Sequence, residues 1–479
     1  MSLKEMLQNS PRYRWFILAI VSVGIFMSTL DSSIVNVALP TISQNMKTDL
    51  SMIQLVVTAY LLTISSLLPI FGRVADLLGR KRVYSLGFIM FTLGSMLCGL
   101  AYNIWFLVAM RIFQAIGASM IMANSAAIIT AIFPPKERGR ALGLTGTVVA
   151  LGSLAGPAVG GILVGFTSWR AIFYINLPIG IFGYIAAQII LPADTPPKVK
   201  PTFDFTGATL FTLGLISLLF AVSYGQAWGW QSTPILLGML LGILLLGLFF
   251  YTEFRVKDPL IDLSLFRNQP FLVGNLAGLL SFVALFSNVI LMPFYLQHIL
   301  LYTPTQVGLL MTAFPLTMAI VAPISGYISD RIGAAVLSTG GLLVTAVGLF
   351  YLSILTSTST TLQIIPGPIL MGLGAGLFNS PNNSSVMSSV HPSKLGVAGG
   401  INALVRNVGM VIGIALSVSL FENRQASFLS TINNPSANMK VQAFMSAYHT
   451  VLLVAMGIAL VAALISLNRK GYALAEKSS

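Results

Sequence analysis

The stretch GLTGTVVALGSLAGPAVGG, residues 143–161, lies in an apolar segment long enough to cross a bilayer. Gly152, Gly156 and Gly160 are four residues apart, so they stack on one face of a helix. A face of glycines lets the backbone of a neighbouring helix approach closely. Pro157 predicts a kink, which membrane helices tolerate because their neighbours can satisfy the freed carbonyl. The stretch therefore predicts a kinked, tightly packed spanning helix.

The composition also indicates an integral membrane protein. Of the 479 residues, 56% are hydrophobic and 8% are charged, whereas a soluble domain has about 25% charged residues. The single cysteine, Cys98, excludes a disulfide within the chain, and we expect it to be a small buried side chain. The first apolar segment is too long for a signal peptide and should remain as a spanning helix.

Apolar runs of roughly 20 residues predict fourteen spanning helices. The predicted ranges are 15–39, 51–72, 82–102, 105–127, 139–166, 169–191, 205–224, 234–254, 270–296, 306–329, 334–354, 361–387, 397–421 and 446–467. An even number of spans places both termini on the same side of the membrane.

The basic residues cluster in alternate loops. If the N-terminus is cytoplasmic, 20 of the 26 Lys and Arg residues lie in cytoplasmic segments. By the positive-inside rule, both termini are then cytoplasmic. The net charge of +13 is thus explained by membrane orientation, and we expect no nucleic-acid partner.

The spans divide into three parts. We predict an N-terminal six-helix half over residues 1–191, a linker with two inserted helices over 192–269, and a C-terminal six-helix half over 270–479. GRVADLLG, residues 72–79, follows the second helix of the first half, and GYISDRIG, residues 326–333, follows the second helix of the last. This echo predicts a repeat, with the substrate held between the halves near mid-membrane.

Asp31 is the acidic residue that lies well inside a predicted span, where a charged carboxylate must face a cavity, pair with a cation or be protonated. It lies 16 residues from Trp15, roughly 24 Å along its helix. Arg111 lies six residues from Trp105, roughly 9 Å along a helix of the opposite direction. Across a core of about 30 Å these depths nearly coincide, so we predict an Asp31–Arg111 contact.

Such a pair could fix packing alone, or it could couple transport to protons. Intramembrane ionisable residues are costly and usually functional, which favours the second interpretation. Arg111 would stabilise the carboxylate, and its displacement would let Asp31 take up a proton.

The same residues resemble family motifs. LDSSIVNVALP, residues 30–40, resembles the first-helix motif of the fourteen-helix drug:proton antiporters of the major facilitator superfamily, with Ser33 where Thr is usual. Leu107–Ser119 resembles their fourth-helix motif, with Arg111 and Gln114 in place. In that family the arginine is implicated in proton transfer, and the resemblance implies this role for Arg111.

The opening stretch carries the same resemblance. Its register is similar to the antiporter motif of that family, and the matching residues are Gly143, Gly152, Gly156, Pro157, Gly160 and Gly161. Trp169–Gly180 and Pro259–Phe271 also resemble fourteen-helix members. The resemblance implies an all-α integral membrane protein with the major facilitator fold, built from 14 transmembrane helices as two six-helix halves plus a two-helix insert.

Gly72–Lys81 resembles the cytoplasmic loop motif of the superfamily. We expect Gly72 and Gly79 to permit a tight turn, Asp76 to pair or cap a helix, and Arg80 to lie at the membrane surface. The segment could simply set topology. We favour a gate, formed by these four residues, that holds the halves together when the inner side is closed.

Candidate residues for a substrate cavity lie in the second half. Asn275 and Asn288 lie on the ninth predicted helix, and Asn379 and Asn382 belong to a polar run that lines a vestibule or marks a helix end. Arg406, in the thirteenth, is either a second coupling residue or a partner for Asp330. No second intramembrane carboxylate is expected in helices 9–14, which favours neutral, monocationic or amphipathic substrates.

The sequence has no GxxxxGK[ST] phosphate loop and no HExxH or cysteine/histidine cluster. We therefore expect no enzyme activity, no metal and no cofactor, with the proton gradient as energy source. We predict a monomeric, multi-pass antiporter of a bacterial cytoplasmic membrane that exports lipophilic compounds, including drugs, for protons. Alternatives are an exporter of a physiological lipid, peptide or metabolite, an uptake symporter, and a sensor or scaffold that does not transport.

Overall fold

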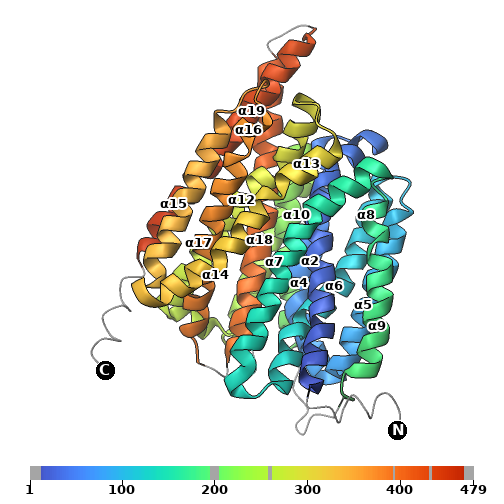
Figure 1. The fold of residues 1–479 in the computed structure, drawn as a ribbon, viewed down its shortest axis with the longest axis vertical. Coiled ribbons are helices and arrows are strands. Elements are labelled where there is room, and N and C mark those ends of the chain that lie inside the picture. Colours follow the sequence, from blue (N-terminus) through green and yellow to red (C-terminus); the bar gives the residue numbers. More distant parts are fainter. Residues whose placement is uncertain (1–11, 195–203, 257–260, 392–393, 431–433, 469–479) are drawn as a thin grey trace.

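The computed structural model describes residues 12–194, 204–256, 261–391, 394–430 and 434–468. Within these ranges the chain is helical, and 14 helices are long and apolar enough to span a membrane. The all-α membrane fold and the number of spans are confirmed. The first helix, α2 (Tyr13–Met46), begins at the end of the bundle where the last, α19 (Ala437–Leu467), ends (Figure 1). We call this the inner end, following the predicted orientation.

The helices are named here in the predicted parts. The N-terminal half contains α2, α3 (Leu50–Ile53), α4 (Leu55–Leu78), α5 (Arg80–Gly99), α6 (Ile104–Ile132), α7 (Pro135–Phe166), α8 (Ala171–Tyr174) and α9 (Asn176–Ile190). The insert contains α10 (Phe205–Trp228) and α11 (Thr233–Glu253). The C-terminal half contains η1 (Leu263–Arg267), α12 (Gln269–Phe294), η2 (Tyr295–Ile299), α13 (Pro304–Met311), α14 (Ala313–Ile332), α15 (Ala334–Ser353), α16 (Thr361–Ile364), α17 (Pro366–Ser388), α18 (Leu395–Leu429) and α19.

Local sequence signals explain where several helices begin. The Asn103 side chain accepts a hydrogen bond from the Phe106 N–H at 2.8 Å and caps α6. Gly79 separates α4 from α5 with φ of 104°, and Gly333 separates α14 from α15 with φ of 93°, a region that favours glycine. The two echoed segments are therefore folded alike, each ending the second span of its half.

Several predicted boundaries are wrong. α2 continues through Pro40 to Met46, and α18 continues to Leu429 rather than ending near residue 421. Polar residues end the apolar run at Glu422, but they do not interrupt the backbone hydrogen bonds of a helix. Glu422 is therefore helical and lies within the candidate span Val397–Leu429, near its outer end, whereas no second intramembrane carboxylate was expected in helices 9–14.

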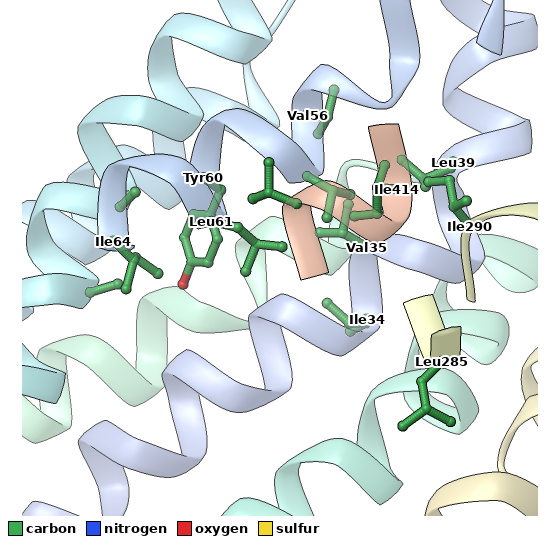
Figure 2. Packing of buried hydrophobic residues seen from close by; sticks show 14 of the residues in the cluster. Ile34, Val35, Leu39, Val56, Tyr60, Leu61, Ile64, Leu285, Ile290 and Ile414 are labelled. Carbon is green, nitrogen blue, oxygen red and sulfur yellow. The ribbon is translucent and has the colours of Figure 1, made fainter. Parts of the chain in front are cut away.

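The two halves share a hydrophobic core. Buried side chains of α2, α4, α12 and α18 belong to one cluster, which includes Val35, Leu39, Ile290 and Ile414 (Figure 2). The described hydrogen bonds between the halves lie toward the outer end, and one joins Gln297 Nε2 to the carbonyl of Val37 at 3.1 Å. This conformation is therefore held closed at the outer end of the bundle.

The insert packs beside both halves. The Gln54 side chain donates to the Ser223 carbonyl of α10 at 3.3 Å, and Ser419 of α18 donates to Gln226 of α10 at 3.2 Å. α10 thus bridges α4 and α18 at the outer end. Residues 195–203 of the predicted linker lie outside the described residues.

Candidate functional site

Asp31 lies near the middle of α2 and its side chain is fully buried. Arg111 of α6, also buried, donates from Nη1 to Asp31 Oδ2 at 2.6 Å. The contact predicted from helix depth is present. A short hydrogen bond between two charged side chains that are shielded from water is a strong interaction.

The second carboxylate oxygen is held by two amides. Gln114 Nε2 and Asn176 Nδ2 each donate to Asp31 Oδ1 at 2.9 Å. Both amides also donate to Ser95 Oγ, at 3.1 and 2.9 Å, and Ser95 donates to the Phe173 carbonyl at 2.9 Å. Side chains from α2, α5, α6 and α9 therefore form one buried network around a single carboxylate.

Arg111 has further partners on α4 and α6. Its Nε donates to the Val56 carbonyl at 3.1 Å, and Nη1 also contacts Gln114 Oε1 at 2.7 Å. The guanidinium carbon lies 4.0 Å from the ring centroid of Tyr60, within cation–π range. The arginine is thus fixed from several sides, and it could leave Asp31 only if α2 or α6 moved.

The glycines of α7 pack on the turn of α2 that carries Asp31. A Cβ added at Gly152 would lie 3.0 Å from Thr29 Cβ, and one at Gly156 would lie 2.6 Å from Ser33 Cβ. A Cβ at Gly160 would lie 2.9 Å from the Ile34 carbonyl oxygen. The predicted glycine face is therefore present and lies against α2. Gly143 lies in α7, but its surroundings are outside the described part of the chain.

The outer half of α7 also contacts the other half of the protein. A Cβ at Gly161 would lie 2.6 Å from the Pro304 carbonyl oxygen of α13, and the Thr305 hydroxyl donates to the Gly161 carbonyl at 3.1 Å. Pro157, whose carbonyl faces Gly308, lies within α7, which continues from Pro135 to Phe166. One helix thus touches both the Asp31 turn and the C-terminal half.

The predicted cytoplasmic gate is mostly helical. Gly72 and Asp76 lie on α4, and a Cβ at Gly72 would meet nothing within 4 Å, so Gly72 forms no turn. The tight connection is made by Gly79 alone. Arg80 donates to Asp76 Oδ1 at 3.0 Å and to the Ala127 carbonyl of α6 at 3.0 Å. In this conformation these described contacts stay inside the N-terminal half, and the gate remains a prediction.

Asn288 lies apart from Asn275, another candidate on the same helix of the C-terminal half. Asn288 accepts a hydrogen bond from the Tyr448 hydroxyl at 3.0 Å, deep between α12 and α19. Asn275 lies 13 residues nearer the inner end of α12, roughly 20 Å away. Asn379 and Asn382 lie within α17, which continues to Ser388, so the polar run is not a helix end.

Arg406 lies on α18 and is half-buried, with no hydrogen bond or ion pair to a described residue. The side chain of Asp330, its suggested partner, is outside the described residues. Among the described residues, no group of three His, Cys, Asp or Glu is placed to hold a metal ion.

Sequence reasoning missed three polar members of these contacts. Asn176 lies in the Trp169–Gly180 stretch, where only a resemblance marked it, and Ser95 lies in an apolar helix without any charge nearby in sequence. Glu422 accepts a hydrogen bond from the Ser51 N–H at 2.9 Å and joins α18 to α3. An uncharged amide or hydroxyl carries little signal until its neighbours are known.

The comparisons with known proteins agree with this architecture. The chain matches the family described as Major Facilitator Superfamily over residues 21–414 and 274–473. It is 38% identical over 412 residues to the riboflavin transporter RibZ of Clostridioides difficile, covering 86% of this chain and 89% of that protein.

It is 34% identical over 414 residues to the multidrug resistance protein Stp of Mycobacterium tuberculosis, covering 86% of this chain and 76% of that one. The fold resembles the inward-facing, unoccupied crystal structure of a bacterial homolog of the human lysosomal transporter Spinster, with a TM-score of 0.68 at 15% identity over 96% and 97% of the two chains. These relatives are transporters rather than enzymes, and the chain belongs to the Major Facilitator Superfamily.

Proposed function

We propose that this transporter exports lipophilic compounds in exchange for protons, with Asp31 as the proton-carrying residue and Arg111 as its partner. The observation that supports this most is the buried carboxylate itself. Asp31 accepts hydrogen bonds from Arg111, Gln114 and Asn176 within the membrane-spanning bundle. Ionisable residues inside a membrane span are costly to place there and are usually functional.

The proposed coupling between proton and substrate rests on α7, because this helix contacts both halves. Gly156 packs on the α2 turn next to Asp31, and Gly161 packs on α13 of the opposite half. When the outer end opens, α13 must leave α7, and the contact between α7 and α2 changes with it. A small shift of α2 would weaken the Asp31–Arg111 contact and let the carboxylate take a proton from outside. Return to the inward-facing state would restore Arg111 and release the proton inside.

The substrate class is proposed from the names of the relatives. Relatives at 32–34% identity bear multidrug names, while RibZ is named a riboflavin transporter. We propose lipophilic drugs as substrates, with the proton gradient as energy source and no cofactor. A second candidate is export of a flavin-like metabolite, which the RibZ similarity favours. We further propose a monomer in a bacterial cytoplasmic membrane with both termini inside.

The test is proton movement in proteoliposomes that carry a pH gradient. A panel of lipophilic cations, neutral drugs and riboflavin would be added to wild type, Asp31→Asn and Asp262→Asn. Asp262 is an acidic residue at the inner surface and serves as a matched control. We expect substrate-dependent proton release in the wild type and the control, and its loss in Asp31→Asn.

The possible results separate the parts of the proposal. Release that persists in Asp31→Asn would keep antiport but would contradict the role of Asp31. Release with riboflavin alone would replace drugs by a metabolite as substrate. No release with any compound would contradict drug:proton antiport and favour a protein that does not carry these compounds.

A further inference from the structure

The C-terminal half contains a cation for which the described residues supply no partner. Arg406 lies within the span Val397–Leu429 and is half-buried. Arg111, by contrast, is balanced by Asp31. An arginine inside a membrane span normally pairs with an acidic group or carbonyl oxygens, because its charge is otherwise costly there.

The packing of α18 on α12 shows at what depth in the helix bundle Arg406 lies. A Cβ at Gly409 would lie 2.7 Å from the Leu279 carbonyl oxygen, and the same type of contact recurs four residues further out on both helices. Asn275 precedes Leu279 by four residues and Arg406 precedes Gly409 by three. The two side chains are therefore level with each other, roughly 10 Å from the inner end of α12.

A buried amide at this depth has an unused polar atom. Asn275 is 3% exposed, and its Nδ2 donates to the Phe271 carbonyl at 2.8 Å while its Oδ1 has no described partner. Buried polar atoms are rarely left without a partner, so this arrangement points to a ligand.

The approach to Arg406 from the inner end is open. Gly399 lies seven residues earlier on the same face of α18, and a Cβ there would meet only Met387 Cε, at 3.9 Å. A Cβ at Gly400 would meet nothing within 4 Å. Because the outer end is closed in this conformation, a compound would reach Arg406 from the inner side.

We propose that Arg406 binds the anionic group of the exported compound and that Asn275 binds a polar group beside it, the compound being an amphipathic molecule with a carboxylate or sulfonate on an apolar body. This inference rests on the proposed export function and specifies its substrate class. The guanidinium would bind the anion in a bidentate manner. Asn275 Oδ1 would accept a hydrogen bond from an N–H or O–H beside the anionic group.

The test is equilibrium binding of a matched series of fluorescent probes to the full chain in phosphatidylcholine nanodiscs. Dansylglycine is anionic, its amide is neutral, and dansylethylenediamine is cationic. The variants are Arg406→Gln, Arg406→Lys and the control Arg424→Gln, an exposed arginine at the outer end of the same helix. A hydrogen bond to a charged group contributes enough that we expect wild type to bind dansylglycine at least about tenfold more tightly than the amide.

Arg406→Gln should abolish this preference, Arg406→Lys should retain part of it, and Arg424→Gln should leave it intact. A purely structural arginine would weaken all three probes equally, and that result would overturn the inference. Equal or absent binding of dansylglycine in wild type would also overturn it. A preference lost when phosphatidylglycerol is included would assign the site to a lipid headgroup instead of an exported compound.

Binding is measured without a proton gradient, so it is separable from antiport. A preference for the anion without proton release would contradict the proposed coupling and retain the anion site. Proton release without this preference would contradict the anion site and retain the proposed coupling.

Discussion

The two halves of this transporter each have an arginine inside a membrane span, but the two arginines have opposite surroundings. In the N-terminal half, Arg111 is enclosed by a carboxylate, an amide, a backbone carbonyl and an aromatic ring. In the C-terminal half, Arg406 lies on the face of α18 that is open toward the inner end and has no described partner. A paired arginine can hold or release a proton site, whereas an unpaired one can bind a ligand. Under the two proposals above, the echoed halves share a fold and divide proton coupling and ligand binding between them.

The largest effect should follow from breaking the pair in the N-terminal half. Arg111→Gln leaves Asp31 buried without its cation, and breaking a buried ion pair costs about 3–5 kcal/mol. We expect a correspondingly lower unfolding midpoint in detergent and no proton-coupled transport. The double variant Asp31→Asn, Arg111→Gln should be less destabilised than Arg111→Gln alone, because no unpaired charge remains. If the destabilisation of the double variant equals the sum of the destabilisations of the two single variants, the two residues do not act as a pair.

The next largest effect is expected in α7, the helix that contacts both halves. Gly156→Ala places a methyl group against Ser33, and overpacking of this kind costs about 1–3 kcal/mol. We expect reduced transport and a lower unfolding midpoint. Gly146→Ala is the matched control, because a Cβ at Gly146 on the same helix meets nothing within 4 Å. Adding Ser33→Gly to Gly156→Ala should recover only part of the activity, because the backbone nitrogen of Ile34 would still lie 2.9 Å from the added Cβ. Equal losses at Gly146 and Gly156 would show that the loss does not come from the α2–α7 contact.

Arg406→Gln should affect stability far less than Arg111→Gln. The side chain has no described partner to leave unpaired, so we expect a change within about 1 kcal/mol, as for substitutions away from packed features. Thermal unfolding of both variants under the same conditions would give the difference. A loss at Arg406 as large as that at Arg111 would reveal a hidden partner and would remove the contrast between the halves.

Much of the fold was predictable because bilayer thickness limits the length of an apolar span. The Asp31–Arg111 contact was also predictable, since each residue is charged and each depth could be counted from a helix end. Asn176 and Ser95 were not, because neutral polar side chains occur widely in membrane helices and only tertiary contacts bring these two to Asp31. The true length of α18 was missed for a related reason. Hydropathy reports burial in lipid, whereas a helix continues wherever its backbone bonds can form.

The smallest effect lies at the inner surface, outside the buried sites of both halves. Asp262, before η1, pairs with Lys394 at 2.6 Å and accepts from the Ser264 N–H at 3.0 Å. Partial burial alone would raise the pKa of Asp262, but the hydrogen bonds from Lys394 and Ser264 outweigh it and hold that pKa below its ordinary value. A lowered pKa in the folded state means that this stabilisation is full above the ordinary carboxyl pKa and is lost as the pH falls through the folded value. Because both side chains are partly exposed, Lys394→Ala should cost at most about 1 kcal/mol at neutral pH and nothing in strong acid. Unfolding midpoints of wild type and Lys394→Ala across acidic pH would test this, and a difference that grows on acidification would contradict the sign.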